Sequence, residues 1–205
     1  MTQLNTPYPS TAYLTGFLRE RGYDVRQADP AIELINRLFC RDGLRAIHDE
    51  LQKLSVKKLA DSASVKFFLK HFAQYELSID AVMSFLQGRD PSIAMRLNQD
   101  DFLPMGPRFR ALDELAKVED DPLAWAFGAL GSQDRAKYLC SLYLDDLGDV
   151  VRDGIDGHFA LSRYGEKLAS SIPTFKPMQQ ALKVQNTLVD RFLIEITNEL
   201  LRDHQ

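Results

Sequence analysis

The sequence predicts a mainly α-helical protein, a multi-helical domain with one small and incomplete α/β unit at its amino-terminal end. Apolar residues recur at i, i+3, i+4 and i+7 through most of the chain, which is the spacing of amphipathic helices. Only residues 23–28 read as a short strand, bounded by Gly22 on one side and by Asp29 and Pro30 on the other. Because one strand cannot pair its own backbone groups, this pattern predicts neighbouring strands from outside the chain.

Composition narrows the class of protein. The 205 residues are 45% hydrophobic and 26% charged, which suits one well-filled core. The net charge of −4 argues against general nucleic-acid binding, which needs a basic surface. No apolar run approaches the roughly 20 residues that span a bilayer, and no signal-peptide pattern opens the chain, so we expect no membrane association. Cys40 and Cys140 lack metal-type spacing, which favours reduced thiols over a disulfide and a cytoplasmic location.

The opening stretch predicts an extended entry, a helix, a turn and a strand. Pro7 and Pro9 favour extended backbone before them, and Ser10 or Thr11 can cap the helix that follows. Gly22 suits the left-handed residue that ends such a helix. One face of this helix carries four apolar side chains, Tyr13, Leu14, Phe17 and Leu18. We therefore divide the chain into a partial α/β unit over residues 1–40 and a helical domain over residues 41–205.

Helical spacing then continues to the end of the chain. Ser62 or Asp61 is expected to begin a helix that runs past Phe72, and Ser78 to cap the next one. Residues 98–107 are expected to form a loop, because they hold two prolines and a glycine. Further helices are expected at 30–40, 42–54, 91–97, 109–118, 133–152, 161–170, near 178–182 and from 187 onwards.

The segment PYPSTAYLTGFLRERGYDVRQAD resembles the first helix and second strand of the Rossmann-like cobalamin-binding domain that precedes many radical S-adenosylmethionine (radical SAM) domains. In that family a proline-containing loop leads into a helix with a Tyr-Leu pair, and a G-x-x-V-x-x-x-D segment forms the next strand. The matching positions here are Pro7, Pro9, Tyr13, Leu14, Gly22, Val25 and Asp29. The later stretches FLQGRDPSIAMRL, RFRALDEL and LSRYGEKLASS resemble the helical segment of some of these proteins.

The resemblance implies an N-terminal region of a radical SAM protein, a fragment without its radical SAM domain. Cobalamin would be a candidate cofactor, and the radical SAM domain of the same parent protein would be the partner; the small-molecule substrate is unknown. The D-x-H-x-x-G motif, whose histidine ligates cobalt, is absent, as is the C-x-x-x-C-x-x-C motif that holds the iron–sulfur cluster. S-adenosylmethionine and the cluster would therefore be bound outside this chain, which would not be catalytic alone.

The loop before the first helix is the foremost candidate for cofactor contact. Asn5, Thr6, Tyr8, Ser10 and Thr11 offer an amide, hydroxyls and a phenol beside a helix N-terminus. In doubly wound folds, ligands bind beyond the carboxyl ends of the strands, where this loop would lie. The competing interpretation is that the serine and threonine cap the helix and the tyrosine packs in the interior.

Two other places have both a structural and a functional interpretation. Asp29 could bind a cofactor hydroxyl, but the proline after it favours a helix cap. Arg163 and Tyr164 could grip a substrate phosphate or carboxylate, whereas Arg163 and Glu166 could instead form a salt bridge within a helix.

A run of aspartates marks the long helix expected at 133–152. Asp145, Asp149 and Asp153 share one face, with Asp146 beside them and His158 just beyond the helix. Such a set could hold a hard metal ion, but a solvated acidic face is the interpretation we favour.

Three functions remain open at this point. The first is the accessory region of a radical SAM enzyme, which shapes a cofactor or substrate site. The second is a helical protein-interaction module without a cofactor. The third is a helical small-molecule sensor built around the apolar stretch LAWAFGALG.

Overall fold

The computed structural model describes residues 9–54, 61–99, 101–110, 112, 131–161, 174–176, 179, 183 and 186–202. Within these residues the secondary structure consists of α-helices and two short 3₁₀ helices, without a β-strand. The mainly α-helical class is therefore confirmed. None of the helices in the described part combines the length and apolar character needed to cross a bilayer.

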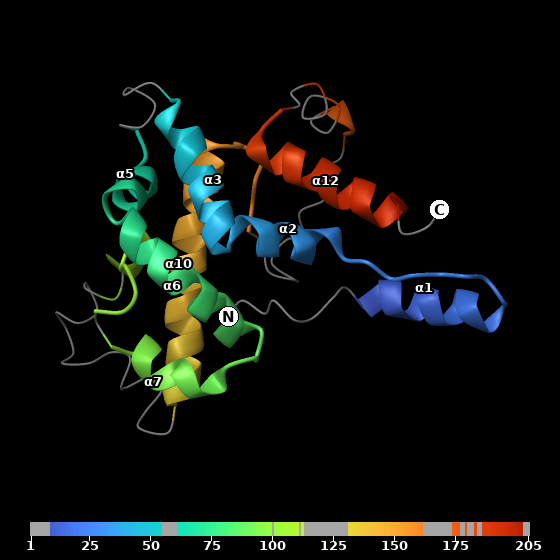
Figure 1. Ribbon diagram of the computed structural model, residues 1–205, viewed down its shortest axis with the longest axis horizontal. Coiled ribbons are helices and arrows are strands. Elements are labelled where there is room, and N and C mark those ends of the chain that lie inside the picture. Colours follow the sequence, from blue (N-terminus) through green and yellow to red (C-terminus); the bar gives the residue numbers. More distant parts are fainter. Residues whose placement is uncertain are drawn as a thin grey trace.

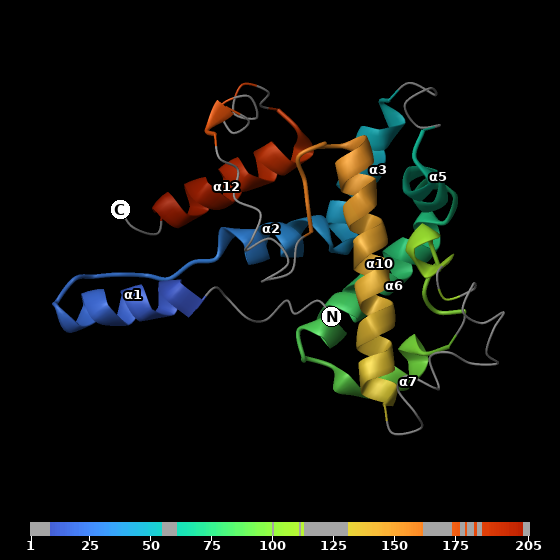
Figure 2. The ribbon, with the colours of Figure 1, turned by 180° about the vertical axis from the view of Figure 1, so that it is seen from behind.

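Helix α10 (Ser132–Gly154) is the spine of the molecule. It crosses behind α3 (Arg41–Gln52) and α6 (Phe72–Leu86) in Figure 1 and stands in front of them in Figure 2. It also packs against α5 (Ala63–Lys70), α7 (Ala94–Leu97) and the 3₁₀ helix η2 (Pro107–Phe109). Apolar side chains on its inner face are buried, among them Leu139, Tyr143, Leu147, Val150 and Val151.

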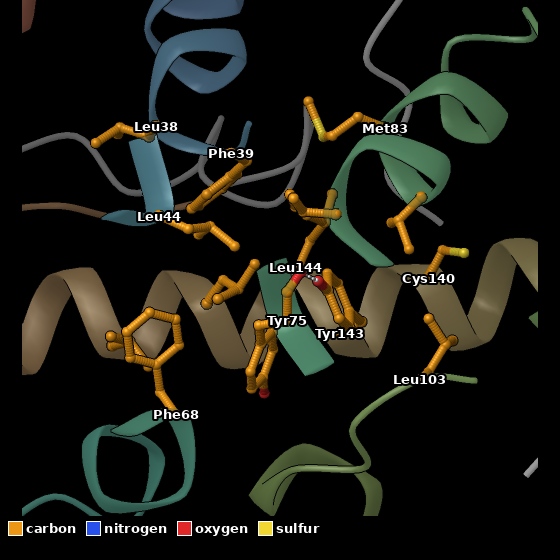
Figure 3. Packing of buried hydrophobic residues seen from close by; sticks show 14 of the residues in the cluster. Leu38, Phe39, Leu44, Phe68, Tyr75, Met83, Leu103, Cys140, Tyr143 and Leu144 are labelled. Atoms are coloured by element: carbon orange, nitrogen blue, oxygen red, sulfur yellow. Dashed lines mark hydrogen bonds between the residues drawn. The ribbon is translucent and has the colours of Figure 1, made fainter. Parts of the chain in front are cut away.

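The core lies between α10 and the helices packed around it (Figure 3). Phe68 and Leu44 are fully buried, and the rings of Tyr75 and Tyr143 stack obliquely with centroids 5.1 Å apart. The Tyr143 hydroxyl donates to the carbonyl oxygen of Tyr75 (3.3 Å) and lies 3.1 Å from Ser78 Oγ. Burying each large apolar side chain stabilises the fold by about 1.5–3 kcal/mol, so this cluster is the main source of stability.

A second group of helices lies at one side of this core. Helix α2 (Pro30–Leu38) packs against α3 and against α12 (Leu188–Arg202). Leu38 and Phe39 belong to the same apolar cluster as residues of α3, α5, α6 and α10. The boundary at residue 40 between two domains stays a prediction, and these two side chains form a packed junction across it.

The helix boundary expected at Ser78 is wrong. Helix α5 ends at Lys70, and α6 begins at Phe72, with His71 between them. Ser78 lies inside α6, where its Oγ donates to the carbonyl oxygen of Gln74 (2.8 Å). Because serine can bond back to the preceding turn in this way, it fits a helix interior as well as a cap. The cap expected at Ser62 is confirmed, since its Oγ accepts from the Val65 N–H (3.2 Å).

The strand expected at residues 23–28 is also wrong. These residues form an extended segment that runs back beside α1 (Pro9–Glu20), and both lie away from the packed helices (Figure 1). A strand requires a neighbour for its backbone groups, and the described part of the chain supplies none. Gly22 does adopt the expected left-handed conformation, with a φ of 80°. The Rossmann-like unit is thus not formed within the described residues.

Several expected elements lie outside the described residues. They are most of the helices at 109–118 and 161–170, the apolar stretch around Trp125, and most of the segment near 178–182.

Candidate functional site

We call α1 and residues 21–29 the arm. Its extended half is fastened to its helical half by side-chain and backbone hydrogen bonds. The Arg19 guanidinium donates twice to the carbonyl oxygen of Val25, from Nε (3.1 Å) and Nη2 (2.9 Å). The Tyr23 N–H donates to the carbonyl oxygen of Leu18 (3.2 Å), which closes the turn at Gly22. The arm is therefore a helix with an extended return held alongside it.

The apolar face of α1 is exposed. Tyr13 is 81% exposed, Leu14 60% and Phe17 50%, whereas Thr15 is the only described residue of this helix that is buried. The Arg21 guanidinium lies 3.5 Å from the centroid of the Phe17 ring, where a cation–π contact covers part of it. An amphipathic helix normally turns such a face toward a core, and the described residues do not cover this one.

Of the predicted cofactor-binding residues, Ser10 and Thr11 lie in the first turn of α1, and Asn5, Thr6 and Tyr8 fall outside the described residues. Because α1 begins at Pro9, neither Ser10 nor Thr11 is the capping residue in front of the helix. Thr11 Oγ1 accepts a hydrogen bond from Gln27 Nε2 (2.9 Å), which brings the end of the extended segment to the start of the helix.

Asp29 is the N-cap of α2, as the proline after it predicted. Its Oδ1 accepts from the Ile32 N–H (3.2 Å), and Pro30 occupies the first helical position. The carboxylate is thus engaged in a structural bond. Its role toward a cofactor hydroxyl stays a prediction.

The described candidate residues do not enclose a cofactor. One shallow cleft lies along α1 and is lined by residues between Ala12 and Glu20, and a second lies between the α2–α3 junction and the end of α6. Neither cleft is lined by Ser10, Thr11 or Asp29. The described residues also contain no group of three or more His, Cys, Asp or Glu side chains placed to hold a metal ion.

The second cleft contains a free thiol. Cys40 is the N-cap of α3, and its Sγ accepts from the Gly43 N–H (3.4 Å). Asp80 lines the same cleft and forms an ion pair with Arg41 (3.0 Å). Cys140 is also free but buried, so the prediction of two unpaired cysteines is confirmed.

A charged network joins α10 to the 3₁₀ helix η2. Arg108 grips Asp149 with two hydrogen bonds, from Nε to Oδ2 (2.6 Å) and from Nη2 to Oδ1 (2.8 Å). Arg152 donates to the same carboxylate (2.6 Å) and pairs with Asp153 (2.8 Å). Ser62 Oγ, at the start of α5, donates to Asp153 Oδ2 (2.7 Å). This network connects three elements that are far apart in the sequence.

The interpretation of these aspartates as a solvated acidic face is wrong for two of them. Asp146 is 1% exposed and Asp149 9% exposed. Burial is the largest single influence on the pKa of Asp149 and raises it. Arg108 and Arg152 together outweigh burial and hold this pKa below its ordinary value. For Asp146, burial dominates and raises the pKa to about 7, because the Arg108 N–H that bonds it (3.0 Å) compensates only in part. The two carboxyls are thus one helical turn apart with opposite shifts.

Sequence reasoning gave Arg108 no role as an ion-pair partner. The residue falls between the loop expected at 98–107 and the helix expected at 109–118, and its carboxylate partners are 38 and 41 positions away. Pro107 at the first position of η2 was the one local signal of an ordered turn here. The predicted anion-binding pair Arg163 and Tyr164 lies outside the described residues.

Comparison of the chain with protein-family models, with curated protein sequences and with solved structures gives no match.

Proposed function

We propose that this chain is an accessory region of a cytoplasmic radical SAM enzyme and that the arm is the part that packs against its partner. The observation that carries the proposal is the exposed apolar face of α1, formed by Tyr13, Leu14 and Phe17. The resemblance of the same stretch to the start of a cobalamin-binding domain supplies the kind of partner, the radical SAM domain.

The physics of the arm supports a docking role. Each large apolar side chain that a partner removes from water contributes about 1.5–3 kcal/mol before the cost of association. The bonds from Arg19 to Val25 hold the extended segment in place, so less conformational entropy is lost when it docks. An extended segment can also add to the edge of a sheet through its backbone groups. A partner with a free sheet edge and an apolar face beside it fits both halves of the arm.

The chemistry belongs to groups that this chain would help to enclose. A radical SAM domain cleaves S-adenosylmethionine reductively at its iron–sulfur cluster and forms a radical on the substrate. In our proposal this chain binds no cluster. It contributes Ser10, Thr11 and Asp29 near one end of the arm, where they would border cobalamin or the substrate only once the partner completes the site.

Docking can be tested with the radical SAM domain of the parent protein, produced as a separate protein. We expect the two purified proteins to elute together from gel filtration, and expect Leu14→Ser combined with Phe17→Ser to abolish this. Leu77→Ser is the matched control, because Leu77 is 76% exposed on α6, in the helical part of the molecule. Equal retention of the wild type and the arm variant would contradict the docking role of α1. The absence of a radical SAM domain from the parent protein would contradict the choice of partner.

A second function, an interaction module without a cofactor, is favoured by one specific observation. The side-chain oxygens of Thr11 and Asp29 already accept hydrogen bonds, from Gln27 Nε2 and from the Ile32 N–H. Anaerobic titration with hydroxocobalamin, first with the chain alone and then with the complex, separates the two functions. Retention of cobalamin by the complex after gel filtration supports the accessory region of a radical SAM enzyme. A stable complex that retains none leaves the cofactor-free module.

A further inference from the structure

Asp146 is an uncompensated buried carboxyl at the contact between α10 and η2. Its Oδ1 accepts from the Arg108 N–H, whereas its Oδ2 has no hydrogen-bond partner among the described residues. Gly106 packs directly on this carboxyl, so closely that a Cβ at position 106 would overlap Oδ2. The side chain is therefore sealed by the turn that leads into η2.

The charges around Asp146 do not neutralise it. The Arg108 guanidinium donates to Asp149, and its charge lowers the pKa of Asp146. Asp149 and Asp145 of the same helix act against it and raise that pKa. From α6 it faces the buried phenol of Tyr75, which carries no positive charge.

The other helices packed on α10 direct their cations elsewhere. Lys66 and Lys70 of α5 are exposed to solvent. On α7, the Arg96 guanidinium lies 4.6 Å from the centroid of the Phe102 ring.

Burying a lone charge costs far more than burying a neutral carboxyl, so the closed structure favours the protonated acid. We propose that Asp146 couples the docking of the Gly106–Phe109 turn on α10 to the uptake of one proton. When the turn lifts, water reaches the carboxyl and the proton leaves. Acidification tightens the turn, and a rise toward neutral pH loosens it.

The direction of the pH dependence, and the pH range over which it acts, follow from the protonation of Asp146 in the closed and in the opened turn. In the opened turn the carboxyl has an ordinary pKa, and in the closed turn burial raises its pKa to about 7. Between these values the opened form holds fewer protons, so its population rises about tenfold for each pH unit. Above about pH 7 both forms are ionised, and the dependence on pH disappears.

Hydrogen exchange at the Arg108 N–H reads the opening directly, because this group donates to Asp146. After correction for intrinsic exchange, we expect its protection in the wild type to fall about tenfold per unit from about pH 5 to pH 7 and then to level off. In Asp146→Asn the slope should vanish. Asp134→Asn is the control on the same helix, since the Asp134 side chain is 56% exposed, and it should behave as the wild type does.

A slope in Asp146→Asn equal to that of the wild type would overturn the proposal. If that variant does not fold, the carbon-13 shift of the Asp146 carboxyl in the wild-type chain decides. A titration midpoint near neutral pH supports the coupling. A midpoint near about 4, the ordinary value for aspartate, contradicts it.

Discussion

The arm and the helices packed on α10 have the same kind of amphipathic sequence, but the apolar face is exposed in the arm and buried in the packed helices. Helix α5, of 8 residues, turns Phe68 into the core, where it is fully buried, and the longer α1, of 12 residues, leaves Phe17 half exposed. In both, apolar side chains recur at helical spacing. The difference shows that periodicity specifies a helix and its apolar face, whereas the partner of that face depends on the rest of the structure.

The largest contrast should come from truncating one phenylalanine in each region. Phe68→Ala should lower the free energy of unfolding by about 3–5 kcal/mol, because it removes buried area and leaves a cavity among well-packed neighbours. Phe17→Ala should lower it by less than about 1 kcal/mol, since it removes only a half-exposed ring and its contact with Arg21. Urea denaturation followed by circular dichroism measures both. Similar losses in the two variants would show that α1 is part of the core.

Most helices of the packed region could be predicted from the sequence, because each had both a period and a boundary signal. Ser62 and Asp29 cap the helices that they were expected to cap, and Gly22 ends α1. The failures have one cause in common. The strand at residues 23–28 and the helix start at Ser78 were predicted from local patterns alone. Whether such a pattern forms the predicted structure depends on a second element that packs or pairs with it, and the local sequence does not identify that element.

Glycine-to-alanine substitutions should have opposite effects in the two regions, destabilising the packed helices and favouring the helix of the arm. Gly43 lies where α3 meets the end of α2, and a Cβ there would overlap the carbonyl oxygens of Arg37 and Leu38. Gly43→Ala should therefore cost about 1–3 kcal/mol of stability, because backbone must move to admit the methyl group. Gly16 has open space around it, and alanine there should favour helix by about 1 kcal/mol.

The readouts differ for the two glycines. Urea denaturation reports the loss in Gly43→Ala, and the gain in Gly16→Ala should be seen as stronger helical chemical shifts in α1. If Gly43→Ala proved neutral, the close approach of α2 and α3 would be wrong.

The charged network could not be predicted to the same extent. The aspartates of α10 stood out in the sequence, but a cationic partner at Arg108 was hidden by a separation of about forty positions and by its place between an expected loop and an expected helix. Burial also overturns the interpretation of these residues as a solvated acidic face, since Asp146 is a buried carboxyl with a raised pKa. Periodicity locates such residues on a face, and only the packing of η2 determines their protonation.

A smaller effect is expected where the arm joins the packed helices. Asp29→Ala removes the bond from the cap to the Ile32 N–H and should lower the free energy of unfolding by about 1 kcal/mol. Asp24→Ala is the control, because Asp24 is exposed in the extended segment, and its effect should stay within about 0.5 kcal/mol. Thermal unfolding of both variants measures the difference. Equal losses would show that charge in the arm, and not the cap, stabilises α2.

The smallest effect should be at the surface contact between α2 and α12. Arg37 pairs with Glu195 (3.4 Å) and with Glu199, and the side chains of both glutamates are more than half exposed. Arg37→Met keeps an apolar stem and should lose only about 0.2–1 kcal/mol, because water and mobile ions weaken exposed pairs. Urea denaturation in low salt and in about 1 M NaCl should show the loss shrinking as salt screens the charges.

Arg37→Lys retains the charge without the planar fork and so separates attraction from geometry at this contact. A loss in Arg37→Met that is independent of salt would mean that the arginine stem, and not its charge, holds α12 on α2. The Arg108–Asp149 pair is the opposite case, an ion pair with a largely buried carboxylate. The Asp149 side chain is only 12% exposed, so salt should leave that interaction nearly unchanged.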